Sequence, residues 1–404
     1  MHNVSNGIAV DRLAALEPFL DAYVSSGRLP GCACLVSRHG KEACFTSIGM
    51  RDVERKLPIE RDTVFRIYSM TKPITSVALM TLYERGAFAL DDPVARYIPQ
   101  WQKLKVFASG NENDFRVTEP ARAMRIKDLF THTSGLTYGF MQSHPVDGMY
   151  RAQDIGGMAT SGTLEEMIGK LADIPLQFSP GARWNYGVST DVLGYLVQKL
   201  ADMPLDEFVR TRITDPLAMK DSGFKVRPDQ AARFAACYER IPNTDAYRLQ
   251  DDATRSAYLS QPSFLSGGGG MVSTIDDYHN FTRMLLGKGE YGGSRILGRK
   301  TLEYMTLNHM PDNKDLAAMG QPVFSETPYD GVGFGLGFSV VIDPAKSNVI
   351  DSVGEYAWGG AASTYFWVDP AESLVVIFMT QLIPSSSYPL RRQLKQIVYQ
   401  TLID

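Results

Sequence analysis

Strand-like segments lie near both ends of this chain, and a long block with helical periodicity separates them. The strand-like runs are residues 31–37, 42–48, 63–68, 335–342, 363–368 and 374–380. Short turns between neighbouring runs favour antiparallel pairing. Helical spacing dominates from Thr75 to about Ser260 and also occurs at residues 10–26 and 390–402. We therefore expect an α/β (α+β) fold: one antiparallel sheet built by both chain ends, flanked by helices, with an inserted mainly helical domain.

The predicted insertion implies a two-domain organisation. At roughly 150 residues per domain, a chain of 404 residues suggests two or three units, or one large unit with an insertion. We place the α/β domain at residues 1–74 and 262–404 and the helical domain at residues 75–261. The active site is expected between them.

Charge and hydropathy exclude several kinds of partner. Lysine and arginine number 41 and aspartate and glutamate 45, so no basic excess is present to neutralise a nucleic-acid backbone. The longest apolar run, Leu374–Met379, is far shorter than the roughly 20 residues of a membrane span. The N-terminus lacks the charged and apolar regions of a secretory signal. We expect a cytoplasmic protein that binds neither nucleic acid nor membranes, and no sequence feature fixes its oligomeric state.

Cysteine and histidine spacing argues against a metal or redox centre. The four cysteines form no C-x-x-C pair, and Cys32 and Cys34 share one face of an apolar run, as small buried side chains do. Unpaired thiols suit the cytoplasm. The six histidines are scattered, with no H-E-x-x-H pattern. We expect neither a metal ion nor a cofactor.

Ser69-Met-Thr-Lys72 is the first segment with a chemical signature. It follows a strand-like run ending at Tyr68 and opens a helical pattern, so Ser69 and Lys72 lie one turn apart, with Cβ atoms about 5–6 Å from each other. The helix dipole stabilises negative charge at Ser69, and both dipole and burial disfavour an ammonium at Lys72. A lysine whose pKa falls from about 10.4 toward neutrality can accept the serine proton. The pair is a candidate nucleophile and base.

An S-x-x-K pattern alone is weak, because this chain holds a second copy, Ser222-Gly-Phe-Lys225. That copy contains a glycine and has no helical pattern behind it, so we interpret it as a turn. The alternative interpretation of Ser69 is a helix N-cap with a solvated lysine one turn later.

Two further segments favour the catalytic interpretation. Trp184-Asn-Tyr186-Gly-Val188 lies between a turn and a helix, where a tyrosine can direct its hydroxyl into a cleft. Trp358-Gly359-Gly360-Ala361 opens a predicted strand, and its glycines let a substrate approach closely. A free N–H there could complete an oxyanion hole with the Ser69 N–H. The structural alternatives are a core tyrosine and a β-bulge.

In this order and spacing, the three motifs resemble those of the serine β-lactamase and penicillin-binding protein superfamily. Over roughly residues 10–400 the chain is most similar to class C β-lactamase-like carboxylesterases, the family VIII esterases. Supporting stretches are residues 90–94, 129–136, 213–219 and 266–274. The resemblance implies Ser69 as nucleophile, Lys72 as its activating partner, Tyr186 as assisting base and proton donor, and the N–H groups of Ser69 and Ala361 as the oxyanion hole. It also implies a packing role for His132.

Two positions depart from the lactamase pattern. The third motif normally begins with lysine or histidine, which receives a substrate carboxylate, and here it begins with Trp358. The tyrosine motif normally ends in asparagine, and here it ends in Val188. With Gly359 and Gly360, these residues are expected to bind substrate in an apolar site. A carboxylate bound without a cation loses a hydrogen bond worth about 1.5–3 kcal/mol, which a neutral ester does not need.

We therefore expect a carboxylesterase that hydrolyses small to medium neutral esters through an acyl-serine intermediate, with a small-molecule ester as its partner. The enzymatic alternatives are an acyltransferase of the same fold and a β-lactamase or D-amino-acid peptidase. A non-catalytic binding protein on this fold is the alternative from another class. Two long irregular stretches, residues 124–162 and 308–329, are expected to shape the acyl and alcohol pockets.

Overall fold

A computed structural model describes residues 4–157, 161–320 and 329–404. Its centre is an eight-stranded sheet with the order β14-β15-β16-β17-β18-β3-β4-β5, in which all neighbours are antiparallel. The strands are β3 (Gly31–Arg38), β4 (Lys41–Asp52), β5 (Leu57–Pro58), β14 (Val332–Phe334), β15 (Ser339–Val341), β16 (Tyr356–Gly359), β17 (Tyr365–Asp369) and β18 (Leu374–Thr380). The two ends of the chain meet where β18 pairs with β3, so the predicted single antiparallel sheet is confirmed.

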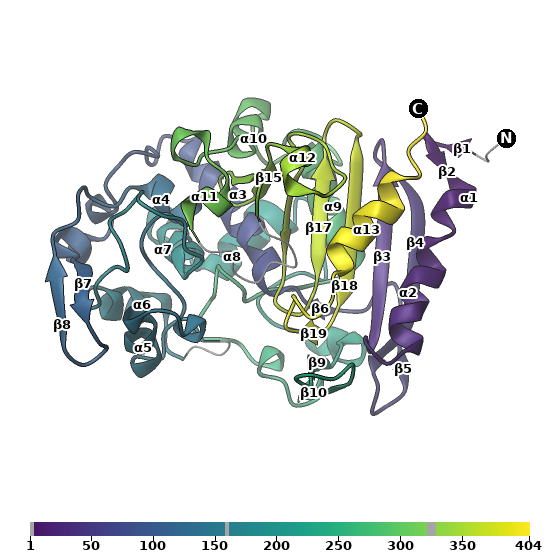
Figure 1. The fold of residues 1–404 in the computed structure, drawn as a ribbon, viewed down its shortest axis with the longest axis horizontal. Coiled ribbons are helices and arrows are strands. Elements are labelled where there is room, and N and C mark those ends of the chain that lie inside the picture. The colour runs from purple at the N-terminus through teal and green to yellow at the C-terminus, as the bar shows by residue number, and fades with distance from the viewer. Residues whose placement is uncertain (1–3, 158–160, 321–328) are drawn as a thin grey trace.

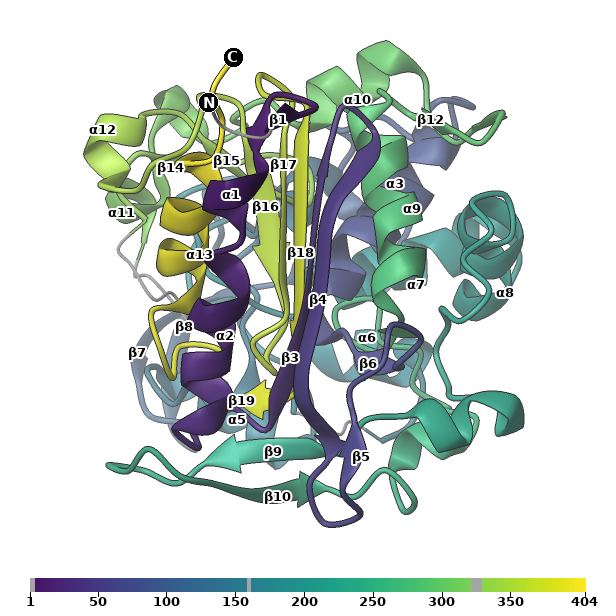
Figure 2. The ribbon, with the colours of Figure 1, turned by 90° about the vertical axis from the view of Figure 1, so that its right-hand side faces the viewer.

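Helices cover both faces of this sheet (Figure 1 and Figure 2). One face carries α1 (Val10–Leu13), α2 (Leu16–Ser25) and α13 (Leu390–Tyr399), and the other carries α3 (Thr71–Tyr83) and α9 (Ile275–Leu286). Every residue of β18 is buried because its side chains alternate between two apolar clusters. Val375 and Ile377 join the cluster of α3 and α9, whereas Val376 and Phe378 join the cluster of α2 and α13.

The segment between the two sheet-forming parts is mainly helical, as predicted, but it also contains strands. Its helices after α3 are α4 (Ile126–Phe130), α5 (Pro145–Ala152), α6 (Leu164–Leu171), α7 (Ser189–Ala201) and α8 (Leu205–Val209). Its strands are β7 (Val106–Gly110), β8 (Phe115–Thr118), β9 (Cys237–Arg240) and β10 (Tyr247–Asp251). The sequence analysis missed these strands, of which β9 pairs in parallel with β19 (Leu382–Ile383) near the other end of the chain.

The domain boundaries at 74/75 and 261/262 stay a prediction. One buried cluster runs from Phe366 of β17 to Leu193 of α7 and so spans both predicted domains. The remaining elements are β1 (Val4–Ser5), β2 (Ile8–Ala9), β6 (Phe65–Arg66), β11 (Val272–Ser273), β12 (Glu290–Tyr291), β13 (Ser294–Arg295), α10 (Arg299–Met305), α11 (Leu316–Met319) and α12 (Pro344–Ser347). Among the residues that the structure describes, no helix has both the length and the apolar character needed to cross a membrane.

Three strand predictions need correction. The run at 63–68 forms only the two-residue strand β6, because a 3-10 turn begins at Tyr68. The run at 335–342 contains a turn, made possible by Gly337 at a φ of 105°, which separates β14 from β15. Trp358 and Gly359 end β16, whereas the sequence analysis had them opening a strand.

Candidate active site

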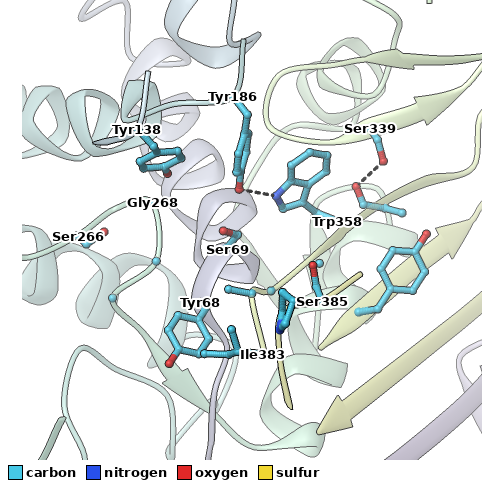
Figure 3. Close-up of a pocket in the computed structure, with 18 of the residues that line it drawn as sticks. Tyr68, Ser69, Tyr138, Tyr186, Ser266, Gly268, Ser339, Trp358, Ile383 and Ser385 are labelled. Atoms are coloured by element: carbon cyan, nitrogen blue, oxygen red, sulfur yellow. Dashed lines mark hydrogen bonds between the residues drawn. The ribbon is translucent and has the colours of Figure 1, made fainter. Parts of the chain in front are cut away.

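A cavity of about 870 Å³ lies where the end of β16 meets the start of α3 (Figure 3). It brings together six residues that the sequence analysis placed in one site: Ser69, Tyr186, Trp358, Gly359, Gly360 and Ala361. Much of the remaining wall is aromatic, from Tyr68, Tyr138, Phe140, Phe224, Tyr258, Phe264, Tyr329 and Tyr365. The cavity therefore has a wall rich in aromatic side chains, although six serines besides Ser69 and several charged residues, among them Arg391, also line it.

The two stretches that the sequence analysis took as irregular each reach this cavity, as expected, but they contain the helices α4, α5 and α11. Residues 124–162 contribute Tyr138, Phe140 and Gly157, and residues 308–329 contribute Tyr329. The parts of these stretches at 158–160 and 321–328 lie outside the described residues.

Ser69 lies in the 3-10 turn Tyr68–Met70, which runs directly into α3. Tyr68 holds a left-handed φ of 42°, a conformation that non-glycine residues seldom adopt and that often marks a functional turn. One helical turn later, Lys72 directs its Nζ back toward the serine, 3.2 Å from Ser69 Oγ. The local i, i+3 geometry predicted for the motif is thus present.

Lys72 is only 2% exposed, and its Nζ contacts three oxygen atoms of the protein. Besides Ser69, its Nζ lies 2.9 Å from Tyr138 Oη and 2.7 Å from the Gly268 carbonyl oxygen. Burial lowers the pKa of Lys72 to about 7, and the Asp191 carboxylate partly opposes this shift. A neutral amine has two hydrogens and one lone pair, so it can donate to Tyr138 and Gly268 while accepting the Ser69 hydroxyl proton. The three contacts therefore suit a base for Ser69.

Tyr186 reaches the same serine from the loop that precedes α7. Its hydroxyl shares a hydrogen bond with Ser69 and accepts the indole N–H of Trp358 at 3.3 Å. Burial raises the pKa of Tyr186, and these two hydrogen bonds oppose the rise. Lys72 Nζ lies 4.5 Å from the centre of the Tyr186 ring, within cation–π distance. Tyr186 is therefore a neutral phenol at rest, adjacent to both Ser69 and Lys72.

The sequence analysis missed two residues of this site, Tyr138 and Asp191. Tyr138 is buried and bonds to Lys72, but it comes from an irregular stretch in which no periodic pattern marks it. Asp191 lies in the first turn of α7, where its Oδ1 accepts from Ser266 Oγ at 2.6 Å and from the Gly268 N–H at 2.9 Å. Its charge acts on Lys72, although the two residues are far apart in the sequence and only the fold brings them close.

One predicted oxyanion donor, the Ser69 N–H, belongs to the serine turn, and the other, the Ala361 N–H, comes just after the end of β16. Within the described ranges, the Ala361 N–H donates to no protein acceptor, so it is free to bind a substrate oxygen. Gly360 allows this close approach, because a Cβ there would lie 2.5 Å from the Ile67 carbonyl oxygen. The glycine at 360 thus lets the end of β16 sit against the turn that carries Ser69.

Two predicted site residues do not line the cavity: Lys72, which contacts Ser69 from the protein interior, and Val188. Val188 caps α7, is 1% exposed, and donates its backbone N–H to Thr137 O at 3.2 Å. Its side chain packs among core residues and is not part of the cavity lining, so the expectation of direct substrate contact is corrected.

The second S-x-x-K copy forms a turn, as predicted. Ser222 Oγ contacts Ser273 Oγ and Asp277 Oδ2, both at 2.8 Å, and Lys225 is exposed. His132 packs against the Tyr186 ring with centroids 4.9 Å apart, in agreement with its expected packing role, and burial lowers its pKa. In the parts of the chain that the structure describes, no group of three or more His, Cys, Asp or Glu side chains could hold a metal ion.

A serine at the start of a helix, a buried lysine one turn on, a tyrosine from another loop and a free N–H are the groups that acyl transfer through a serine uses. The chain belongs to the Beta-lactamase family, whose model matches residues 16–400. This membership confirms the resemblance inferred from the three motifs.

Two kinds of relative illustrate the chemistry found on this fold. Esterase EstB of Burkholderia gladioli is 30% identical over 97% of this chain and 96% of its own length. The solved structure of EstCE1, described as a hydrolase with promiscuous acyltransferase activity, superposes with a TM-score of 0.81 at 27% identity and covers 97% of this chain and 99% of its own. Simvastatin synthase LovD of Aspergillus terreus, in a mutant form, gives a TM-score of 0.81 at 25% identity over 96% of this chain and 95% of its own.

Proposed function

We propose that this protein is a carboxylesterase that hydrolyses small to medium esters through an acyl-serine intermediate on Ser69. The observation that carries the proposal is the buried Lys72, which faces Ser69 Oγ at 3.2 Å with a pKa lowered to about 7. The similarity to Esterase EstB and to EstCE1 supports ester hydrolysis as the reaction. Intact Ser69, Lys72 and Tyr186 argue against a non-catalytic binding protein.

In the proposed acylation, Ser69 Oγ attacks the ester carbonyl while its proton moves to the Lys72 amine. The oxyanion that forms is stabilised by the N–H groups of Ser69 and Ala361. Tyr186 then donates its proton to the departing alkoxide, so the O–H bond of the alcohol forms as that of the phenol breaks. The Lys72 ammonium returns its proton to the phenolate, and water repeats the sequence in reverse to release the acid.

Ester hydrolysis is expected to fall as the pH drops below about 7, because the Lys72 ammonium cannot accept the serine proton. The Asp191 carboxylate favours the ammonium, so Asp191→Asn should move the acid limb of the kcat/KM profile to lower pH. The measurement is the pH dependence of kcat/KM for 4-nitrophenyl butyrate in both proteins. Asp276→Asn, which alters an exposed carboxylate paired with Arg61, serves as the control and should leave the limb in place. An Asp191→Asn limb that stays fixed or moves upward would contradict the role given to Lys72.

Neutral esters are the expected substrates, since Trp358 carries no charge at the position where lactamases have a cation. We expect 4-nitrophenyl butyrate to be hydrolysed with a kcat/KM at least about tenfold above that for a chromogenic cephalosporin, the loss of one charge-assisted hydrogen bond. Both substrates are measured on one enzyme preparation. A preference for the cephalosporin would favour the β-lactamase alternative.

Acyl transfer is the second candidate function, and the similarity to EstCE1 and simvastatin synthase favours it. The largely aromatic wall could hold an alcohol in place of water at the deacylation step. Adding an acceptor alcohol and analysing the products separates the two reactions: a new ester indicates transfer, and free acid alone indicates hydrolysis.

A cytoplasmic location completes the proposal. It is supported by four cysteines that are all free, of which Cys32, Cys34 and Cys237 are buried. Fractionation of cells followed by detection of the protein with an antibody tests this location.

A further inference from the structure

Trp358 makes a contact that a residue lining a pocket for substrate does not need. Its indole Nε1 lies 3.3 Å from the hydroxyl oxygen of Tyr186, and this contact links β16 to a loop 172 positions earlier in the chain (Figure 3). The sequence analysis assigned Trp358 to substrate binding alone. The structure places its only polar side-chain atom within hydrogen-bond distance of a candidate catalytic group.

The direction of this hydrogen bond is fixed by chemistry. An indole N–H is a donor only, so the Tyr186 oxygen must accept from it. The phenol hydrogen is therefore not used in this bond and is left for the departing group. A donor on the phenol oxygen stabilises the phenolate more than the phenol, and this opposes the effect of burial on the pKa of Tyr186.

The indole has little freedom to move away from this position. The side chain of Trp358 is 7% exposed, and its ring packs edge-to-face on Phe334 with centroids 5.2 Å apart. Its backbone is held in the sheet, where Trp358 pairs with Phe366 of β17. Other solvent or protein groups therefore compete poorly for its N–H.

We propose that Trp358 is a positioning residue for Tyr186, which holds the phenol oxygen beside Ser69 and stabilises the phenolate that forms when Tyr186 protonates the leaving alkoxide. This inference rests on the proposed esterase mechanism. In that step the phenol O–H bond breaks, the alcohol O–H bond forms, and the electron pair stays on the Tyr186 oxygen. The phenolate oxygen accepts the Trp358 N–H, and the Lys72 ammonium lies near the same residue, with its Nζ 4.5 Å from the centre of the phenol ring.

Two esters with the same acyl group test this role, because they differ in their need for a proton. Ethoxide is a strong base and must be protonated as it leaves, whereas 4-nitrophenolate leaves as a stable anion. Trp358→Phe removes the N–H and keeps an aromatic ring. It should lower kcat/KM for ethyl butyrate about 10- to 100-fold, while kcat/KM for 4-nitrophenyl butyrate changes by about threefold or less. A role in packing against the acyl group would lower both values equally.

The double variant Tyr186→Phe/Trp358→Phe gives an independent readout. If Trp358 acts through Tyr186, the double variant hydrolyses ethyl butyrate no more slowly than Tyr186→Phe alone. Multiplying effects would overturn the proposal. Trp101→Phe is the matched control, since it also removes a buried indole N–H, the one bonded to Ile168 O at 3.0 Å, and should leave the ratio of the two esters unchanged.

The outcomes separate this inference from the proposed function. If the natural sequence hydrolyses neither ester, the proposed function fails. If both esters are hydrolysed and Trp358→Phe leaves their ratio unchanged, the positioning role of Trp358 fails and the esterase proposal stands. Since each ratio is measured on a single preparation, a variant that folds in reduced yield still gives a decisive result.

Discussion

Ser69→Ala and Lys72→Ala should each lower kcat for ester hydrolysis at least about 10³-fold, and the double variant should be little worse than either single one. Without Ser69 no acyl-enzyme can form. Without Lys72 the serine loses the group 3.2 Å away that accepts its proton, so the nucleophile remains a neutral hydroxyl. Because the two residues act as one unit, their effects do not multiply. The measurement is kcat for 4-nitrophenyl butyrate in the two single variants and the double variant.

The second S-x-x-K copy supplies the matched control for this prediction. Ser222→Ala and Lys225→Ala make the same substitutions in the same sequence pattern, at two residues that do not themselves line the cavity, although Phe224 between them does. Ser222→Ala removes hydrogen bonds to Ser273 and Asp277, so it is expected to affect stability before it affects turnover. A large loss of turnover in Lys225→Ala, with Lys72→Ala nearly active, would mean that the wrong copy has been assigned.

Local periodicity accounts for the proximity of Ser69 and Lys72, which the sequence analysis predicted and the structure shows. Ser69 and Lys72 are one helical turn apart, so their proximity follows from the start of α3 and needs no knowledge of the rest of the chain. The hairpin of β3 and β4 is similarly local, and alternation of period two places its side chains on the correct faces. Such features depend on neighbours in sequence, which a single chain displays directly.

The missed residues depend on contacts between distant segments. Tyr138 meets Lys72 across 66 positions, and Asp191 meets Gly268 across 77. The parallel pairing of β9 with β19 joins segments on opposite sides of the inserted helices. No periodic pattern marks these residues, because their partners are set by how the loops before α7 and β11 fold over the serine turn. The expectation for Val188 failed for the same reason: motif position implied a pocket residue, but Val188 caps the start of α7 and its side chain is buried in the core.

The family pattern and the structure point to two different roles for Trp358. The family pattern identifies the position as unusual because it lacks a cation, which led to an interpretation in terms of substrate charge. The structure shows that Trp358 offers one side-chain hydrogen-bond donor, the indole N–H, and that this donor faces Tyr186. Loss of a charge and gain of a neutral donor have different consequences: the first changes which substrates bind, and the second changes how readily the phenol gives up its proton.

Tyr186→Phe should lower kcat/KM for ethyl butyrate about 10²- to 10⁴-fold, the usual contribution of a general acid or base, with a much smaller change in KM. The ring remains in place, so contacts with His132 and Trp358 persist while the group that transfers the proton is lost. The loss should be smaller for 4-nitrophenyl butyrate, whose leaving group needs no proton.

The same substitution carries a cost in stability that must be measured beside activity. Tyr186→Phe leaves the buried Trp358 N–H without an acceptor, which typically destabilises a fold by about 1–3 kcal/mol. Tyr150→Phe is the control, because Tyr150 is also buried and its hydroxyl bonds to the backbone of Thr137, away from the cavity lining. The measurements are urea unfolding and kcat/KM for both esters in each variant. Near-normal hydrolysis of ethyl butyrate by Tyr186→Phe would reduce Tyr186 to a packing residue, and the role of Trp358 as its donor would fail with it.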